Sequence, residues 1–349
     1  MSPTPPLPLP PLRFEPILKA RAWGGDRLTR FGRDVPEDAA IGESWDLADL
    51  PSSIEGGRSR VAEGPLAGRT LAELRTDDPA AVLGHRPPAA TGGFPMLVKL
   101  LDARENLSVQ VHPDPAYADA HPDTFVKNEA WFVLDAEPGA AVYRGIDPAC
   151  TSEAFFAAAS SGDLLRHLTR IEVRPGDCVR LPSGICHALG EGVLVAEVQT
   201  PSDTTFRVWD WNRDDPNRPL HLAQARACMR FGDRQDDGRP AVVRLDDVPG
   251  VERDGIMTRR VCTTDDFTID HLRLAAGRRL PIAMDGEPRV LIGISGTGAV
   301  TDAAGRTVRL SAGDTVLLPA SCGSPTVEAR GDLNLLWVDL PVMPAGALA

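Results

Sequence analysis

The chain has 349 residues, of which 42% are hydrophobic and 25% are charged, a composition typical of a globular protein with a sizeable core. Its formal net charge is −12 and its basic residues form no block, which argues against a surface for nucleic acid or for an anionic membrane. A small anionic ligand needs only a local cluster of cations, so this charge leaves such a ligand possible.

The N-terminus, MSPTPPLPLPP, is rich in proline and lacks the basic start and continuous apolar core of a signal peptide. We expect residues 1–12 to be a flexible or polyproline lead-in. No apolar run reaches the length that spans a membrane, and the six cysteines include no CxxC pair. We therefore expect reduced, mostly buried thiols and a cytoplasmic protein.

Short runs of alternating apolar and polar residues, separated by Gly, Pro and Asp, recur along the chain. In chain order they include GESWDLADL, FPMLVKLLD, LSVQVH, EAWFVLDA, GAAVYRGI and GVLVAEVQT. Many short strands between turns are typical of an all-β barrel or sandwich. Helical periodicity is limited to TLAEL near Leu71, to residues 152–168 behind a cap at Thr151 or Ser152, and to residues 220–231.

An internal repeat divides the chain. Residues 173–192 and 310–329 both contain Gly-Asp, then alternating apolar residues, then Leu-Pro, and the Gly-Asp suits a tight turn. Such a repeat predicts two related β-barrels. The copies differ in that His187 follows the first Leu-Pro, whereas Gly323 and Ser324 stand in the second. We therefore expect a metal in the first barrel and none in the second.

The domain boundaries follow from this repeat and from a polar, charge-rich stretch between its copies. After the lead-in we expect an N-terminal metal-binding domain with helical insertions at 13–235. A connector at 236–256 and a C-terminal, metal-free domain at 257–349 complete the predicted organisation.

Four residues of the first barrel form a candidate metal site. Gln110 and His112 are two apart in LSVQVH, so their side chains share one face of a strand. Glu129 opens the run EAWFVL, and His187 follows the Leu-Pro turn. Each residue taken alone has a plain alternative as a packed or solvated group. Together they form a mixed nitrogen and oxygen set without cysteine, which suits an open catalytic Zn²⁺ site, although Fe, Mn or Co would also fit.

Charged residues in apolar surroundings lie near this set in the sequence. Lys99 stands in LVKLLDA, Arg207 is flanked by Phe206 and Val208, and Lys127 precedes Glu129 by two residues. The common fate of such residues is a solvated surface. Their apolar neighbours favour partial burial instead, and a buried cation needs an anionic partner. Glu197, in VAEVQT, is a carboxylate that either pairs with a cation or acts as a base.

At these residues the sequence resembles the mannose-6-phosphate isomerases (phosphomannose isomerases) of the shorter bacterial type, in the cupin superfamily. The resemblance covers most of the chain. Its motifs, in the family's order, are RAWGG, GESWDLA, FPMLVKLLDARENLSVQVHPD, KNEAWFVLD, PGDCVRLPSGICHALG and QTPSDTTFRVWDWNR. The residues before Phe14 have no counterpart in the family, and Asn128 stands where relatives often have Thr or Pro. The implied fold is mainly β, with two cupin-like (jelly-roll) barrels and a few short helices.

The resemblance also implies roles for individual residues. It makes His112, Glu129 and His187 ligands of one Zn²⁺ per chain, with Gln110 as a fourth. It makes Arg207 a catalytic arginine. The remaining positions of the expected substrate pocket are Lys99, Ser108 and Lys127.

The implied reaction interconverts mannose 6-phosphate and fructose 6-phosphate through a cis-enediol. We expect Lys99 and Ser108 to hold the phosphate, and Lys127 to reach the phosphate or a sugar oxygen. The proton-shuttling base is open between Glu197, a metal-bound water and a lysine. The alternatives are a cupin isomerase for another sugar phosphate, a metal-dependent cupin dioxygenase, or a sugar-binding cupin without activity. We expect a monomer or homodimer that acts on a small sugar phosphate.

Overall fold

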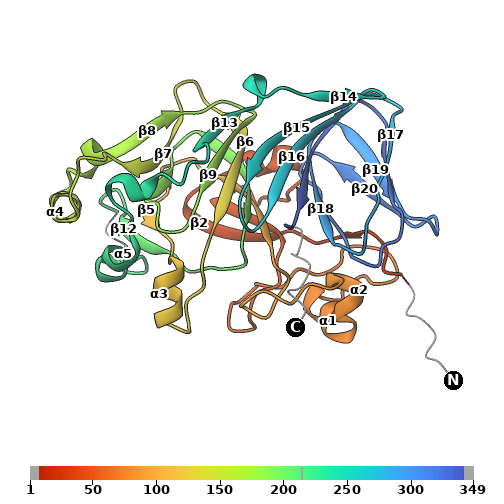
Figure 1. Cartoon of the computed structure of the whole chain (residues 1–349), viewed down its shortest axis with the longest axis horizontal. Coiled ribbons are helices and arrows are strands. Elements are labelled where there is room, and N and C mark those ends of the chain that lie inside the picture. The colour runs from red at the N-terminus through yellow and green to blue at the C-terminus, as the bar shows by residue number, and fades with distance from the viewer. Residues whose placement is uncertain (1–7, 214, 342–349) are drawn as a thin grey trace.

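The computed structural model describes residues 8–213 and 215–341, and this part of the chain contains 23 strands, five α-helices and four short 3₁₀-helices. The mainly-β expectation is therefore confirmed. All strand pairs are antiparallel, and the strands form four sheets in two units, an N-terminal and a C-terminal one, that lie side by side (Figure 1). None of the four sheets closes on itself within the described residues.

The N-terminal unit consists of a large and a small sheet. The large sheet has the order β13 (Val242–Arg244), β9 (Asp177–Leu181), β6 (Glu129–Ala136), β11 (Val193–Gln199), β4 (Leu97–Asp102), β3 (Ile41–Leu47) and β2 (Ile17–Gly25). The small sheet has the order β12 (Phe206–Trp209), β5 (Val109–Val111), β10 (His187–Leu189), β7 (Ala141–Ile146) and β8 (Leu168–Glu172). Side chains of both sheets, such as Trp131 and Val142, share one core between them.

The C-terminal unit repeats this arrangement. Its large sheet has the order β1 (Leu12–Arg13), β21 (Thr315–Leu318), β18 (Arg289–Ser295), β23 (Leu333–Asp339), β16 (Thr268–Leu274), β15 (Ile256–Thr263) and β14 (Val251–Arg253). Its small sheet has the order β17 (Arg279–Pro281), β22 (Thr326–Ala329), β19 (Thr297–Thr301) and β20 (Thr307–Ser311). The two sheets of this unit also enclose a core of their own.

The two large sheets pack against each other. Phe132 and Val198 of the N-terminal unit lie in one core cluster with Ile269 and Leu336 of the C-terminal unit. The layers are therefore small, large, large and small sheet, and β6, β9, β15 and β16 lie together near the middle of Figure 1. This explains the continuous apolar run of β6, because a strand buried on both faces has no polar face.

The expected lead-in and connector both contribute to sheets. From Pro8 onward the lead-in lies on the C-terminal unit, where the Leu9 amide donates to Ser321 Oγ at 3.1 Å and β1 pairs with β21; its residues 1–7 lie outside the described part. Within the connector, β13 extends the N-terminal large sheet and β14 extends the C-terminal one. The domain boundaries stay a prediction.

The helices are short. They are α1 (Leu71–Asp77), α2 (Pro79–Leu83), α3 (Pro115–Ala120), α4 (Ser152–Ser161) and α5 (Leu222–Cys228). The 3₁₀-helices are η1 (Arg27–Phe31), η2 (Leu164–His167), η3 (Gly232–Gln235) and η4 (Leu245–Asp247). No helix in the described ranges is long and apolar enough to cross a membrane.

The helix expected over 152–168 is shorter than predicted. Thr151 is its N-cap, since its side chain accepts a hydrogen bond from the Ala154 amide. The helix ends before Gly162, whose φ of 80° is left-handed and stops an α-helix. The residues after it form η2, and Leu168 begins β8. All six cysteines are buried, and none forms a disulfide in the described structure.

Candidate active site

A row of side chains crosses the small sheet of the N-terminal unit. In the strand register His187 of β10 lies opposite Gln110 of β5, and Gln110 lies opposite Arg207 of β12. Directly opposed residues point to the same face of a sheet. Three residues that sequence reasoning could not align are thus neighbours on the face that lies over the large sheet.

His112, Glu129 and His187 meet between the two sheets. Their potential ligand atoms all lie within 4.8 Å of one another, and the three residues are buried. His112 Nε2 lies 3.4 Å from Glu129 Oε2, and His187 Nε2 lies 3.1 Å from Glu129 Oε1. Glu129 is the first residue of β6, so the carboxylate comes from the large sheet and His187 from the small one.

Backbone carbonyls orient both imidazoles. Nδ1 of His112 lies 3.0 Å from the Thr204 carbonyl, and Nδ1 of His187 lies 2.8 Å from the Ile185 carbonyl. A carbonyl only accepts, so Nδ1 carries the proton and the Nε2 lone pair points inward, as it does in histidines that bind metals. Burial, and then Lys127, lower the pKa of His112 to about 3, so its ring is neutral.

These atoms fit a divalent metal ion. His112 Nε2 and Glu129 Oε1 are buried without a well-formed hydrogen bond in the described residues, an arrangement that is costly unless a cation satisfies it. Burial raises the pKa of Glu129, but the Lys127 ammonium opposes burial and helps to hold this pKa well below its usual range. The Lys127 ammonium lies 2.7 Å from Glu129 Oε2.

Gln110 lies at the edge of this set. Its amide Nε2 is 3.4 Å from His187 Nε2, and its Oε1 accepts from Ser108 Oγ at 3.2 Å. The oxygen and nitrogen of an amide are interchangeable by a flip of the side chain, and Ser108 can accept as well as donate. The flipped amide turns Oε1 toward His187 Nε2.

A cavity of about 470 Å³ opens beside these ligands, a size typical of a small-molecule site. Gln110 and Lys127 line it next to the three buried ligands. The other polar residues that line it are Arg21, Glu43, Lys99, Ser108, Glu197, Asp203, Thr205, Arg207, Asp215, Asn217 and Arg218. All the sequence-predicted substrate and catalytic residues therefore border one cavity.

A second row, on the large sheet, forms part of the cavity wall. Trp45, Lys99, Glu197 and Trp131 are successive cross-strand neighbours. Lys99 Nζ lies 3.1 Å from Glu197 Oε1 and 5.1 Å from the centre of the Trp45 ring, while Trp131 Nε1 donates to Glu197 Oε2 at 2.8 Å. The burial predicted for Lys99 is confirmed, since 4% of it is exposed.

Arg207 is half-buried and differs from the other cations of the cavity. Its guanidinium donates to the Pro219 carbonyl at 2.8 Å, and its Nε is buried without a partner in the described residues. No carboxylate lies within ion-pair distance of it in this part of the chain. Burial, followed by the nearby Arg218, lowers the pKa of Arg207.

Sequence reasoning missed several residues of this cavity. Arg21 and Glu43 form an ion pair at 2.7 Å. They stand in the motifs RAWGG and GESWDLA, so the motifs could have pointed to them, but nothing in the sequence indicates that they pair. Asp203, Asp215 and Arg218 lie in polar stretches with no apolar pattern to mark them. Only the fold brings these residues to the site.

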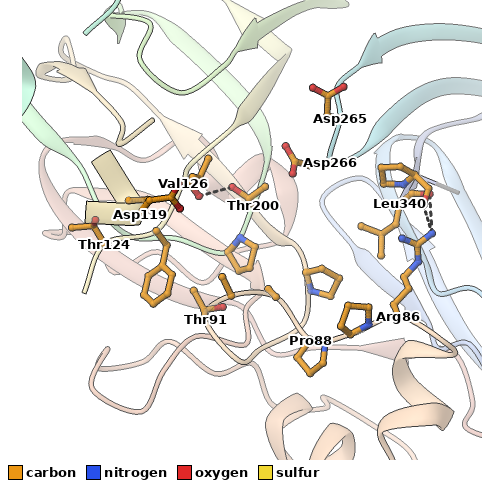
Figure 2. Close-up of a pocket in the computed structure, with 18 of the residues that line it drawn as sticks. Arg86, Pro88, Thr91, Asp119, Thr124, Val126, Thr200, Asp265, Asp266 and Leu340 are labelled. Carbon is orange, nitrogen blue, oxygen red and sulfur yellow. Dashed lines mark hydrogen bonds between the residues drawn. The ribbon is translucent and has the colours of Figure 1, made fainter. Parts of the chain in front are cut away.

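A larger cavity of about 660 Å³ lies elsewhere, and Figure 2 shows the residues around it. Prolines and alanines, Pro88 among them, make up nearly half of the residues that line it, and Thr91, Val126 and Leu340 also border it. Arg86 borders it but is occupied, because it pairs with Glu287 and donates to carbonyls of the C-terminal segment. It contains none of the candidate ligands, so the smaller, charged cavity is the candidate active site.

Comparison with known proteins gives consistent matches along the chain. The model of "Phosphomannose isomerase type I, catalytic domain" matches residues 12–136. A probable mannose-6-phosphate isomerase of Bacillus subtilis is 36% identical over 91% of this chain and 96% of its own length. A mannose-6-phosphate isomerase of Streptococcus mutans is 31% identical over 93% of this chain and 97% of its own.

A solved structure shows the same architecture. The crystal structure of the mannose 6-phosphate isomerase from Bacillus subtilis superimposes with a TM-score of 0.81 and 30% identity, over 95% of this chain and 99% of that one. The sequence identity extends across both β units and the structural match covers nearly all of each chain. The chain therefore belongs to the type I phosphomannose isomerase family.

Proposed function

We propose that this chain is a metal-dependent aldose–ketose isomerase that interconverts mannose 6-phosphate and fructose 6-phosphate through a cis-enediol. The observation that carries the proposal is the buried His112–Glu129–His187 triad beside a cavity lined by lysines and arginines. Membership of the family and the names of its relatives support the choice of reaction.

We assign one Zn²⁺ to this triad, with Gln110 Oε1 as the fourth protein ligand. Two imidazoles and a carboxylate are ligands that zinc accepts, and the absence of cysteine favours a catalytic over a structural site. The backbone carbonyls that hold each Nδ1–H support this assignment. When bound, the ion supplies Lewis acidity for the sugar oxygens at C1 and C2.

Glu197 is our candidate for the proton shuttle. Isomerisation moves a proton from C2 to C1 on one face of the enediol, so one carboxylate oxygen can take it and return it. Glu197 borders the cavity, its Oε2 accepts from the Trp131 indole, and its Oε1 lies 3.1 Å from the Lys99 ammonium. The Lys127 ammonium is held against Glu129 instead, so it is less suited to accept a proton.

The other polar groups stabilise charge and bind the sugar. Arg207 and Lys127 would offset the negative charge that builds on oxygen as the C–H bond breaks. Lys99 and Ser108 border the same cavity and would bind substrate oxygens. Charged groups dominate this cavity, which disfavours a dioxygenase with an apolar pocket. Buried free thiols support a cytoplasmic location.

The test measures formation of fructose 6-phosphate directly by chromatography. Purified protein is assayed with mannose 6-phosphate, with glucose 6-phosphate as a second aldose phosphate, and with unphosphorylated mannose. We expect turnover of mannose 6-phosphate, its loss after chelation and its return with Zn²⁺, with one bound metal per chain. Preferred turnover of glucose 6-phosphate, or turnover that survives complete metal removal, would contradict the proposal.

A pair of histidine variants controls this test. His112→Ala removes a proposed ligand and is expected to abolish both stoichiometric metal binding and turnover. His121→Ala changes an exposed histidine that contacts Tyr117 and lies outside the triad. It is expected to behave like the unmodified protein, so a similar loss in both variants would count against the assigned ligand.

A further inference from the structure

The loop after β12 forms one border of the active-site cavity. Asp215, Asn217 and Arg218 of this loop line the cavity. Near its start Trp211 and Asn212 have left-handed φ angles of 56° and 58°, which are unfavourable for residues with a side chain. The Trp211 indole donates to the Leu107 carbonyl at 2.6 Å, a contact that helps to fix this loop conformation.

Asp210 aligns the guanidinium of Arg218. Nε of Arg218 donates to Asp210 Oδ2 at 2.7 Å and Nη2 donates to Oδ1 at 3.0 Å. This fork uses two of the five N–H groups of an arginine. Nη1 makes no hydrogen bond within the described part of the chain, and the side chain is 14% exposed, so donors remain for a ligand in the cavity.

Arg218 lies next to Arg207, at the end of the active-site row. The Arg207 guanidinium donates to the carbonyl of Pro219, the residue that follows Arg218. The register places His187, Gln110 and Arg207 side by side. Arg207 is thus two strands away from His187, and Arg218 lies beside Arg207. A substrate with its C1 and C2 oxygens at the ligands would extend toward Arg218.

The arginine pair is better suited to a phosphate than Lys99 is. Lys99 is buried beside Glu197, and it also lowers the pKa of the buried Glu43. A phosphate dianion at Lys99 would therefore face two carboxylates. The two guanidiniums near one another repel, and a dianion relieves that repulsion while accepting bidentate hydrogen bonds. Asp215 also borders this region, but it is partly exposed and pairs with neither arginine in the described residues.

We propose that Arg218, beside Arg207, binds the phosphate group of the substrate, at the end of the cavity away from the metal ligands. This inference rests on the proposed function for the identity of the sugar, but not for the binding of phosphate. It makes Arg218 a substrate-binding residue and leaves Lys99 to position Glu197 and to contact other substrate oxygens.

The test compares Arg218→Gln with Arg213→Gln. Arg213 also pairs with Asp210, at 3.2 Å, but does not line the cavity. Binding of inorganic phosphate and of mannose 6-phosphate is measured by calorimetry on metal-loaded protein, beside kcat and KM. We expect Arg218→Gln to weaken phosphate binding and to raise KM about tenfold or more, the range for a lost hydrogen bond to a charged group, with a much smaller change in kcat.

Two further measurements separate binding from folding. Arg218→Lys keeps the charge without the fork, so its KM should fall between the values for the unmodified protein and Arg218→Gln. The thermal midpoint of each variant reports on folding. Equal phosphate affinities for Arg218→Gln and Arg213→Gln would overturn the inference, even if the protein isomerises mannose 6-phosphate. Absent isomerisation with phosphate binding that depends on Arg218 would instead overturn only the proposed function.

Discussion

Replacement of Lys99 by Met tests whether the buried ion pair of Lys99 with Glu197, on the N-terminal large sheet, stabilises the fold. Lys99 and Glu197 lie 3.1 Å apart, with side chains 5% and 3% exposed. At an effective dielectric constant of 20 their attraction is about 5 kcal/mol. Breaking a buried pair by removing one partner costs about 3–5 kcal/mol, because the remaining charge stays buried. We therefore expect Lys99→Met to lose about 3–5 kcal/mol of unfolding free energy.

Thermal and chemical unfolding measure this loss. A 349-residue chain has an unfolding entropy of about 0.7 kcal/mol per kelvin, so the expected fall in melting temperature is about 4–7 °C. Glu43 gives a second readout. Burial raises its pKa, but Lys99 and Arg21 outweigh burial and hold the value at about 2. Without Lys99 the pKa of Glu43 should rise. The loss of unfolding free energy that accompanies protonation of Glu43 should then occur at a higher pH than in the unmodified protein.

The double variant Lys99→Met/Glu197→Gln is the decisive control. It removes both charges, so it should be more stable than the sum of the two single losses predicts, by about 1–3 kcal/mol. Strict additivity of the single effects, or a Lys99→Met protein within 1 kcal/mol of the unmodified one, would refute the reasoning and mean that water screens the pair.

Two further predictions concern stability. His271 lies in the core between the units, where burial and then Arg259 and Arg273 lower its pKa to about 4. In the unfolded chain His271 takes up a proton near pH 6.5, so the free energy of unfolding should fall as the pH drops from 6.5 toward 4. Between pH 7 and 5, urea unfolding should show that the His271→Gln protein loses about 2 kcal/mol less of this free energy than the unmodified protein does. Equal losses in the two proteins would disprove this. Gly84 has φ +68° and a Cβ there would lie 2.0 Å from the Gly286 carbonyl oxygen, whereas Gly64 has φ +80° and open space around it. Gly84→Ala should therefore lower the thermal midpoint clearly more than Gly64→Ala, which carries only the backbone penalty of about 1 kcal/mol. Equal midpoints would contradict this and mean that the two units move apart at this contact to make room for the Cβ.

The sequence predicted the buried triad because its signals are local. Gln110 and His112 share a strand face by simple alternation, and His187 follows a recognisable turn. The helix over 152–168 was predicted too long, because its apolar periodicity continues beyond Gly162, whose left-handed backbone ends α4. Helix α3 was missed although Asp114 caps it and Pro115 begins it, since six residues, fewer than two turns, give too little periodicity to detect.

What the sequence could not predict is cross-strand register. The neighbours His187, Gln110 and Arg207 come from three strands separated by long connections. Alternation specifies which face a residue occupies, but not which residue of another strand lies opposite it. Arg218 was missed for a related reason. Its loop is polar, as is typical of solvated surface. Only the folded path of the chain after β12, where Arg207 donates a hydrogen bond to the Pro219 carbonyl, brings Arg218 to the cavity.

The C-terminal unit contributes to the site through the back of the N-terminal large sheet, against which it packs. On β11, Glu197 faces the cavity, whereas Ala196 and Val198 face the core shared with the C-terminal unit. On β6, Trp131 and Phe132 divide in the same way. A strand held on both faces cannot shift without disturbing one core, since interiors are closely packed. The position of Glu197 relative to the proposed metal ligands therefore depends on residues of the unit that carries none of the proposed catalytic groups.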